Sequence, residues 1–422
     1  MAKYGPRSDN VPPSRRTRMR RSAAEWCSRG ALAIAVAIVG WFAVSHTLAQ
    51  VVEVSDPARA YVLAPWDGRN TAALAEARVL AGASDQAGTS ALARTALRQD
   101  PTAVAAAATL AINAKLTGQN ARSDRLFAYA ERLSRRNLAT QLWAIENAVG
   151  RGDVAGALNH YDITFRTTAK GPDLLFPVLG QAISDPTIRA ALAEMLMRRP
   201  MWTDDFVGYL AASGPDPLAT AQLFDRLRQV HVPIAPLAQA QLVGTLVTRY
   251  RSDEAWSAYT ATRPGSERQR SRDAHFIAAL ATDTPSLFDW VTGAAPGITA
   301  SIQRVGKVGL LDFATSTNVA GVLVQQLELL PPGSYRLIGH SDNLDQPEAS
   351  RPYWALQCRP DGRELGRIMI SNSRENGGIF TGSFSVPSGC PTQMFSLNAQ
   401  PTDKIAGVAG QIDRVELVRA EE

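Results

Sequence analysis

Lysine, cysteine and histidine are scarce in this chain of 422 residues. It has five lysines against 39 arginines, three cysteines and five histidines, the last at positions 46, 160, 231, 275 and 340. No two histidines stand four apart, so a zinc site built on one face of a helix is excluded. GxSxG, the glycine-rich phosphate loop ending in Gly-Lys-Ser/Thr, CxxC and HExxH are also missing.

These absences exclude the common hydrolase, nucleotide-binding, thiol-redox and zinc-protease signatures. We therefore predict no catalytic residues, no cofactor and no enzymatic activity. The enzymatic alternative is a polysaccharide-processing enzyme, such as a glycosidase or a lyase. Its active site would be assembled from dispersed carboxylates, which no sequence motif reveals.

Basic charge is lacking outside the N-terminus. Residues 1–29 contain eight basic and two acidic side chains, a net charge of +6, whereas the whole chain is +5. The remaining 393 residues therefore sum to about −1. A body of this charge does not provide the broad basic face that phosphate backbones require, and we predict no nucleic-acid partner.

A long apolar run follows the basic tail. Residues 31–44 are all apolar or glycine, and the segment 30–49 is long enough to cross about 30 Å of hydrocarbon. The arginines before it place residues 1–29 in the cytoplasm and the bulk of the chain outside, which predicts a single-pass bacterial inner-membrane protein with a periplasmic body. A cleaved signal peptide ending at Ala49 is the alternative.

The two cysteines beyond this run, Cys358 and Cys390, form an even pair in the exported part of the chain. In an oxidising compartment such a pair is most simply a disulfide. Two separate buried thiols are the alternative.

Beyond a linker at 50–70, residues 71–293 have helical spacing and are rich in Ala, Leu and Arg. Turn signals at 84–85, 118–119 and 152–153 recur every 34 residues. Ala96, Ala130 and Thr164 follow the same period. This pattern resembles tetratricopeptide repeats over about 71–168, with degenerate helix pairs to about 291. The resemblance implies a solenoid that binds a protein partner. A spacer without a partner is the alternative.

After a linker at 294–308, the helical period disappears and eight short strands separated by Pro-Gly, Asp-Gly and Asn-Gly-Gly turns are expected in residues 309–422. This spacing predicts an antiparallel two-sheet sandwich, so the fold class is multidomain, an α-helical part followed by an all-β part. The segments 330–337 (LPPGSYRL) and 410–417 (GQIDRVEL) resemble galactose-binding-like jelly rolls, which include many carbohydrate-binding modules.

That resemblance implies a ligand and a metal to look for. Sugar binding needs exposed aromatic faces, for which the candidates are Tyr353, Trp354 and Phe380. Side chains alternate between the two faces of a strand, so the alternative for Trp354 is a place in the core. Tyr353, on the opposite face, is the better exposed candidate. Many such modules hold a structural calcium ion, and Asp312 and Asp413 occupy comparable places. Two ordinary strand aspartates are the alternative.

Together these features resemble accessory proteins of bacterial envelope or exopolysaccharide systems. The hypothesis is a non-enzymatic, membrane-anchored periplasmic adaptor. Its solenoid would bind an envelope protein and its sandwich a polysaccharide or another envelope protein.

Overall fold

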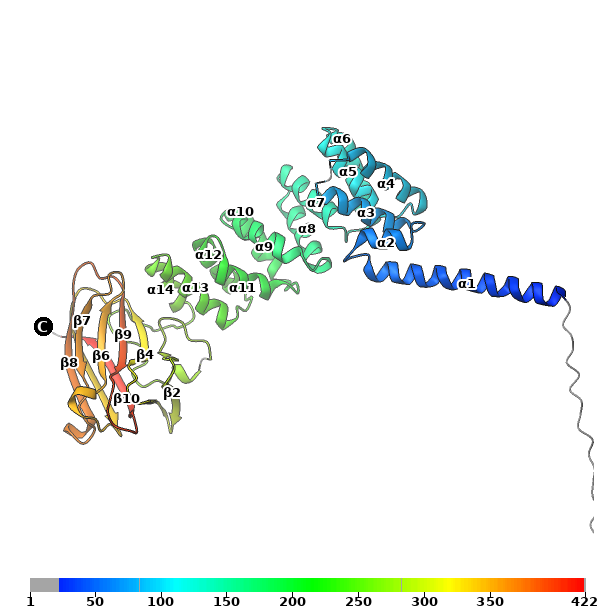
Figure 1. Cartoon of the computed structure of the whole chain (residues 1–422). Helices are drawn as coiled ribbons and strands as arrows, with labels where there is room; N and C mark the ends of the chain where they lie inside the picture. The colour runs from blue at the N-terminus through cyan, green and yellow to red at the C-terminus, as the bar shows by residue number, and fades with distance from the viewer. Residues whose placement is uncertain (1–22, 83, 282, 421–422) are drawn as a thin grey trace, which may run out of the picture. The chain divides into compact units, whose positions relative to one another are not determined.

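The computed structural model describes residues 23–82, 84–281 and 283–420, so most of the predicted cytoplasmic tail lies outside the described residues. The chain forms two compact units, Met1–Ala144 and Ile145–Glu422, which are described separately. The first unit is helical, and the second contains further helices followed by a β-sandwich (Figure 1).

The first unit begins with a long exposed helix. Its elements are α1 (Ala23–Val52), α2 (Pro57–Leu63), α3 (Gly68–Leu80), α4 (Gln86–Gln99), α5 (Val104–Leu116), α6 (Asn120–Leu133) and the first half of α7 (Leu138–Gly150). Within α1, the segment Ala24–Val52 contains an 18-residue window with a mean hydropathy of 1.9 and is long and apolar enough to cross a membrane. Its large apolar side chains up to Val44 are exposed.

The end of α1 is packed, unlike its beginning. Ala49 forms a small core with Ala60 and Ala64, and all three are completely buried. The range 50–70, expected as a linker, thus contains the end of α1, all of α2 and the start of α3. Asp56 and Asp67 cap α2 and α3 by accepting backbone N–H groups, which explains why these helices start where they do.

The predicted 34-residue spacing is present as helix pairs. The second helices of three pairs begin at Gln86, Asn120 and Val154. Gly82, Gly118 and Gly152 precede them with φ of 70–75°, a conformation that glycine adopts without strain. Ala96, Ala130 and Thr164 are each completely buried, as small residues between closely packed helices should be. Membership of the tetratricopeptide family stays a prediction.

The second unit continues with antiparallel helices. They are the second half of α7, α8 (Val154–Thr167), α9 (Gly171–Ala182), α10 (Pro186–Leu196), α11 (Thr203–Ser213), α12 (Pro217–Gln229), α13 (Pro236–Thr248) and α14 (Ser252–Thr260). Prolines begin three of them, at α10, α12 and α13, where a missing N–H costs nothing.

The helices end at Thr260, about 30 residues before the expected boundary at 293. The segment 261–290 instead packs on the sandwich, because its large apolar side chains complete that core. Phe276 and Trp290 are 0% and 3% exposed and belong to the same core cluster as Trp354 and Phe395. The sandwich domain therefore begins well before residue 309.

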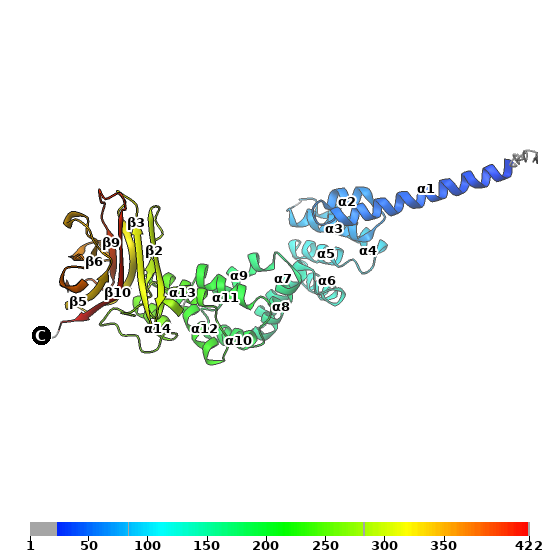
Figure 2. The same ribbon diagram turned by 90° about the horizontal axis from the view of Figure 1, so that it is seen from below.

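The sandwich has two five-stranded antiparallel sheets. One has the order β1-β4-β9-β6-β7 and the other β2-β3-β10-β5-β8; β2, β3 and β10 run side by side in Figure 2. The strands are β1 (Val291–Thr292), β2 (Ile298–Val305), β3 (Val308–Thr315), β4 (Gly321–Glu328), β5 (Gly333–Asp342), β6 (Tyr353–Cys358), β7 (Glu364–Met369), β8 (Ile379–Val386), β9 (Gln393–Ala399) and β10 (Val408–Arg419).

All eight predicted strands are present, and two were missed. Strand β2 lies in the range expected to be a linker, 294–308. It is an edge strand that leaves most of its side chains at least partly exposed, so its sequence shows little hydrophobic alternation. Strand β1 is only two residues long.

A buried ion pair ties the segment 261–290 to the sandwich. Arg272 lies 2.8 Å from the carboxylate of Glu328, which is completely buried at the end of β4. The same guanidinium donates to the backbone carbonyls of Phe288 and Leu327. The guanidinium carbon of Arg272 also lies over the ring of Trp256 in α14, 5.5 Å from the ring centre. These contacts join the last helix, the segment and the sheet.

Candidate functional site

The outer face of the β1-β4-β9-β6-β7 sheet is the strongest candidate for ligand binding. Cross-strand pairing places Tyr353 of β6 beside Met369 of β7 and Asn398 of β9. The outward side chains of these three strands are Tyr353, Ala355, Gln357, Glu364, Arg367, Met369, Met394, Ser396 and Asn398. The larger of these side chains surround the two small residues Ala355 and Ser396.

Two of the three aromatic candidates lie in the core. Trp354 is completely buried and stacks on Phe395 with ring centres 4.5 Å apart. Phe380 is 3% exposed. The prediction that these two rings contact a sugar is therefore wrong. Strand alternation points Trp354 inward, and Phe380 fills the inner side of β8, where it contacts the backbone at Gly339.

Tyr353 is half-buried and lies on the outer face. The guanidinium of Arg367 lies over its ring, 4.1 Å from the centre. Nε and Nη2 of Arg367 donate hydrogen bonds to the two carboxylate oxygens of Glu364, at 3.1 and 2.9 Å. These hydrogen bonds raise the pKa of Arg367 above its usual range. The two hydrogen bonds to Glu364 hold the guanidinium over the Tyr353 ring. The guanidinium and the ring together form one flat surface.

The chemistry of this face suits a neutral ligand with many hydroxyl groups. Arg367 and Glu364 are the charged outward side chains of β6, β7 and β9, and they neutralise each other. Around the Tyr353–Arg367 surface lie the side-chain amides of Gln357 and Asn398, whose nitrogens donate to the Gly362 carbonyl and to Ser396. Planar polar groups beside a flat guanidinium–aromatic surface can bind sugar hydroxyls and the C–H face of a sugar ring together.

The aspartates predicted to hold calcium have other partners. Asp312 accepts a hydrogen bond from Gln411 at 2.8 Å, and Asp413 accepts one from His340 at 2.9 Å. Among the described residues, no group of three or more His, Cys, Asp or Glu side chains is placed to hold a metal ion. We therefore do not propose a calcium site at these residues.

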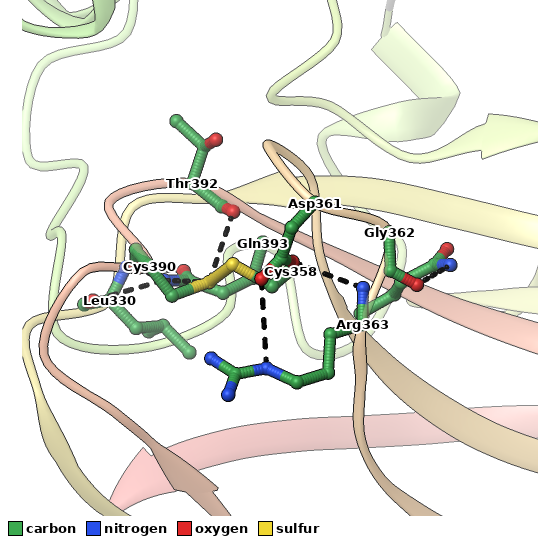
Figure 3. The surroundings of a disulfide bond; sticks show 9 residues. Leu330, Cys358, Asp361, Gly362, Arg363, Cys390, Thr392 and Gln393 are labelled. Atoms are coloured by element: carbon green, nitrogen blue, oxygen red, sulfur yellow. Dashed lines mark hydrogen bonds and ion pairs between the residues drawn. A yellow bond between two sulfur atoms is a disulfide. The ribbon is translucent and has the colours of Figure 1, made fainter.

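The structure joins Cys358 and Cys390 in a disulfide, the pairing expected from the sequence. It links the end of β6 to the loop between β8 and β9 (Figure 3). The side chain of Gln393 lies beside it, accepts from the N–H of Leu330 at 2.9 Å and donates to the Leu330 carbonyl at 3.3 Å. The bond and the amide together hold three loops at one end of the sandwich.

Replacing both Cys358 and Cys390 by Ala is expected to lower the free energy of unfolding of the sandwich by about 3–4 kcal/mol, because the bond closes a 32-residue loop. The strands should still form, since the core does not depend on the sulfurs. Hydrogen exchange of β6 and β9 peptides along a urea series measures the effect. Cys27→Ser, which removes the exposed free cysteine of α1, is the control and should change nothing. An unchanged urea midpoint of unfolding in the double variant would contradict the prediction.

The second candidate site is a recess of about 420 Å³ where α14 and the segment 261–290 meet the sandwich. Several of its polar side chains are engaged within the protein: Tyr259 donates to Asp289 at 3.0 Å, and Asp273 accepts two backbone N–H groups at 2.7 and 2.9 Å. Burial and the charge of Asp289 raise the pKa of the Tyr259 hydroxyl. These side chains hold the joint together, and we prefer the sheet face as the binding site.

No family model matches this chain, and no curated protein sequence matches it. Solved structures with some similarity include tailspike protein 4 of bacteriophage CBA120, at 10% identity and a TM-score of 0.26. That match covers 36% of this chain and only 22% of the tailspike chain.

Two carbohydrate-binding modules also have some similarity. The xylan-binding domain of Paenibacillus barcinonensis Xyn10C matches at 16% identity and a TM-score of 0.22, covering 31% of this chain and 87% of the domain. A family 4 carbohydrate-binding module matches at 12% identity and a TM-score of 0.23, covering 32% and 88%. TM-scores this low do not assign a function to this chain.

Sequence reasoning identified Tyr353 but missed Arg367 and Asn398. Both stand on strands that were predicted, and alternation alone would have divided each strand between two faces. Which residue of β7 or β9 lies beside Tyr353 depends on the register between strands, and that comes from the structure.

Proposed function

We propose that this protein is a non-catalytic, membrane-anchored periplasmic adaptor that binds a neutral polysaccharide on the outer face of the β1-β4-β9-β6-β7 sheet. The observation that carries the proposal is the charge-neutral surface of Tyr353, Arg367 and Glu364, with the side-chain amides of Gln357 and Asn398 beside it. An open sheet face admits a polymer chain, whereas the recess near α14 would admit one or two sugar units.

The exposed apolar part of α1 supports the anchor. Side chains such as Leu32, Val39 and Trp41 are 66–69% exposed, which is unfavourable in water and favourable in hydrocarbon. The buried state of Ala49 supports an uncleaved anchor over a signal peptide. Cleavage after Ala49 would remove that residue from its core with Ala60 and Ala64.

The helix pairs support the second binding role. Helix pairs in both units, such as α3–α4 and α13–α14, expose polar and apolar side chains, the kind of surface by which helical repeats bind proteins. An envelope protein is the partner class that fits a periplasmic location.

The test is polysaccharide binding by the full chain in detergent, screened over neutral and acidic glycans. Tyr353→Ala is expected to weaken binding of the best neutral glycan at least tenfold, about 1.4 kcal/mol, because it removes the ring on which Arg367 rests. Arg336→Ala, an exposed side chain on the outer face of the other sheet, is the matched control and should bind normally.

Other results would contradict the proposal. Equal binding by the Tyr353 and wild-type proteins would remove the sheet face as the site. Weakening by Arg263→Ala alone would point to the recess near α14 instead. Release of reducing ends from the bound glycan, abolished by replacing one carboxylate, would favour the enzymatic alternative.

A further inference from the structure

The turn between α2 and α3 lies beside the apolar part of α1. The ring of Trp66 in this turn contacts Phe42 of α1, with ring centres 4.6 Å apart. Trp66 is nevertheless 43% exposed, and Val62, one helical turn earlier in α2, is 77% exposed. Two large apolar side chains outside α1 thus remain uncovered close to the helix.

The depth of this turn follows from the position of Phe42. The unbroken apolar run of α1 ends at Val44; Ser45 is buried in the folded unit, and Leu48 and Val51 further along α1 are again exposed. Two residues correspond to about 3 Å along a helix axis, so the Trp66 ring stands near the end of the apolar run. In a protein anchored by α1, that level lies in the outer part of the bilayer, close to where α1 leaves it.

The turn is also fixed in place. Asp67 lies 3.3 Å from His46 of α1 and accepts the N–H of Arg69 at 2.8 Å, so the residue after Trp66 is bound both to α1 and to the start of α3. The core of Ala49, Ala60 and Ala64 holds α2 against α1. Trp66 therefore cannot leave this level without breaking these contacts.

We propose that the Pro65–Trp66 turn is a second membrane contact, inserted into the interface of the bilayer that α1 crosses. This inference rests on the proposed anchor. An indole ring combines an apolar body with an N–H donor and prefers the headgroup region. Trp26, 64% exposed near the other end of the run, provides the matching ring. Two contacts orient the first helical unit on the membrane surface, which one helix alone would leave free to rotate.

The experiment uses the full chain in liposomes, in a Cys27→Ser background. Single cysteines at Ile38, Pro65 and Val54 are labelled with an environment-sensitive fluorophore, and quenching by spin-labelled phospholipids is measured. Ile38 lies in the exposed apolar run, Pro65 is exposed and leaves Trp66 intact, and Val54 is 93% exposed beyond the end of α1. The disulfide between Cys358 and Cys390 stays oxidised and unlabelled.

We expect quenching at Pro65 to reach at least about half of that at Ile38 and to exceed that at Val54 several-fold. Adding Trp66→Ser to the Pro65→Cys variant should bring its quenching down toward the Val54 level. Strong quenching at Ile38 with Pro65 equal to Val54 would overturn the inference and leave the anchor intact. A blue-shifted but unquenched label at Pro65 would indicate a protein or a second copy there and would also overturn it. No quenching at Ile38 would refute the anchor itself.

Discussion

A fragment of residues 309–422 is expected to remain unfolded under conditions in which residues 252–422 fold. The shorter fragment has the boundaries that the sequence suggests, but it lacks Phe276, Trp290 and Ile298, which are 0–8% exposed in the sandwich core. Truncating one large buried side chain costs about 2–5 kcal/mol, and a domain has only about 5–15 kcal/mol in total. The shorter fragment also loses β2, the partner of β3, and Arg272, the partner of Glu328.

Circular dichroism and the dispersion of amide proton signals in NMR spectra measure the difference. The point variants Phe276→Ala and Trp290→Ala in the longer fragment are the controls for the core argument, and each should lose about 3–5 kcal/mol. A 309–422 fragment with dispersed signals and a cooperative transition would show that the segment 261–290 is dispensable.

Arg272→Met is expected to reduce the free energy of unfolding by about 3–5 kcal/mol near pH 8, because it leaves the completely buried Glu328 carboxylate without its counter-ion. Arg268→Met is the matched control: Arg268 also lies 5.5 Å from the Trp256 ring, but its ion pair with Asp253 is exposed and should contribute about 0–1 kcal/mol. The double variant Arg272→Met with Glu328→Leu should regain much of the loss, since no charge then remains buried.

The loss should depend on pH in a defined direction. Burial raises the pKa of Glu328 from 4.5 to about 7, opposed by Arg272. The folded protein thus holds this proton more tightly than the unfolded chain, so the stability from this group is greatest below about pH 4.5 and falls as pH rises toward 7. Without Arg272 the pKa rises further, and the fall continues above pH 7.

Urea unfolding of the wild type and the Arg272→Met variant at pH 5.5 and 8.5 checks this direction. The difference between the two proteins should be larger at pH 8.5 than at pH 5.5. An equal difference at both values would mean that Glu328 keeps one protonation state throughout this range in both proteins.

Local features of the sequence determined many of the elements. The apolar run from Ala31 to Val44 lies in the exposed helix α1, and the 34-residue turn spacing corresponds to helix pairs with Gly118 and Gly152 in their turns. Eight strands and the pair Cys358–Cys390 are present as well. Each of these depends on neighbouring residues, on backbone conformations that only glycine adopts readily, or on having a single available partner.

Only the tertiary structure decided what covers each surface. Trp354 and Tyr353 are adjacent aromatic residues, yet one is completely buried under Phe395 and the other lies under Arg367 on the outer face. The segment 261–290 has no marked hydrophobic period. Its place in the sandwich is set by Phe276 and Trp290, which pack in the core against strands that lie far away in the sequence. Burial and pairing of this kind are set by side chains that meet from far apart along the chain, so the periodicity of one segment cannot specify them.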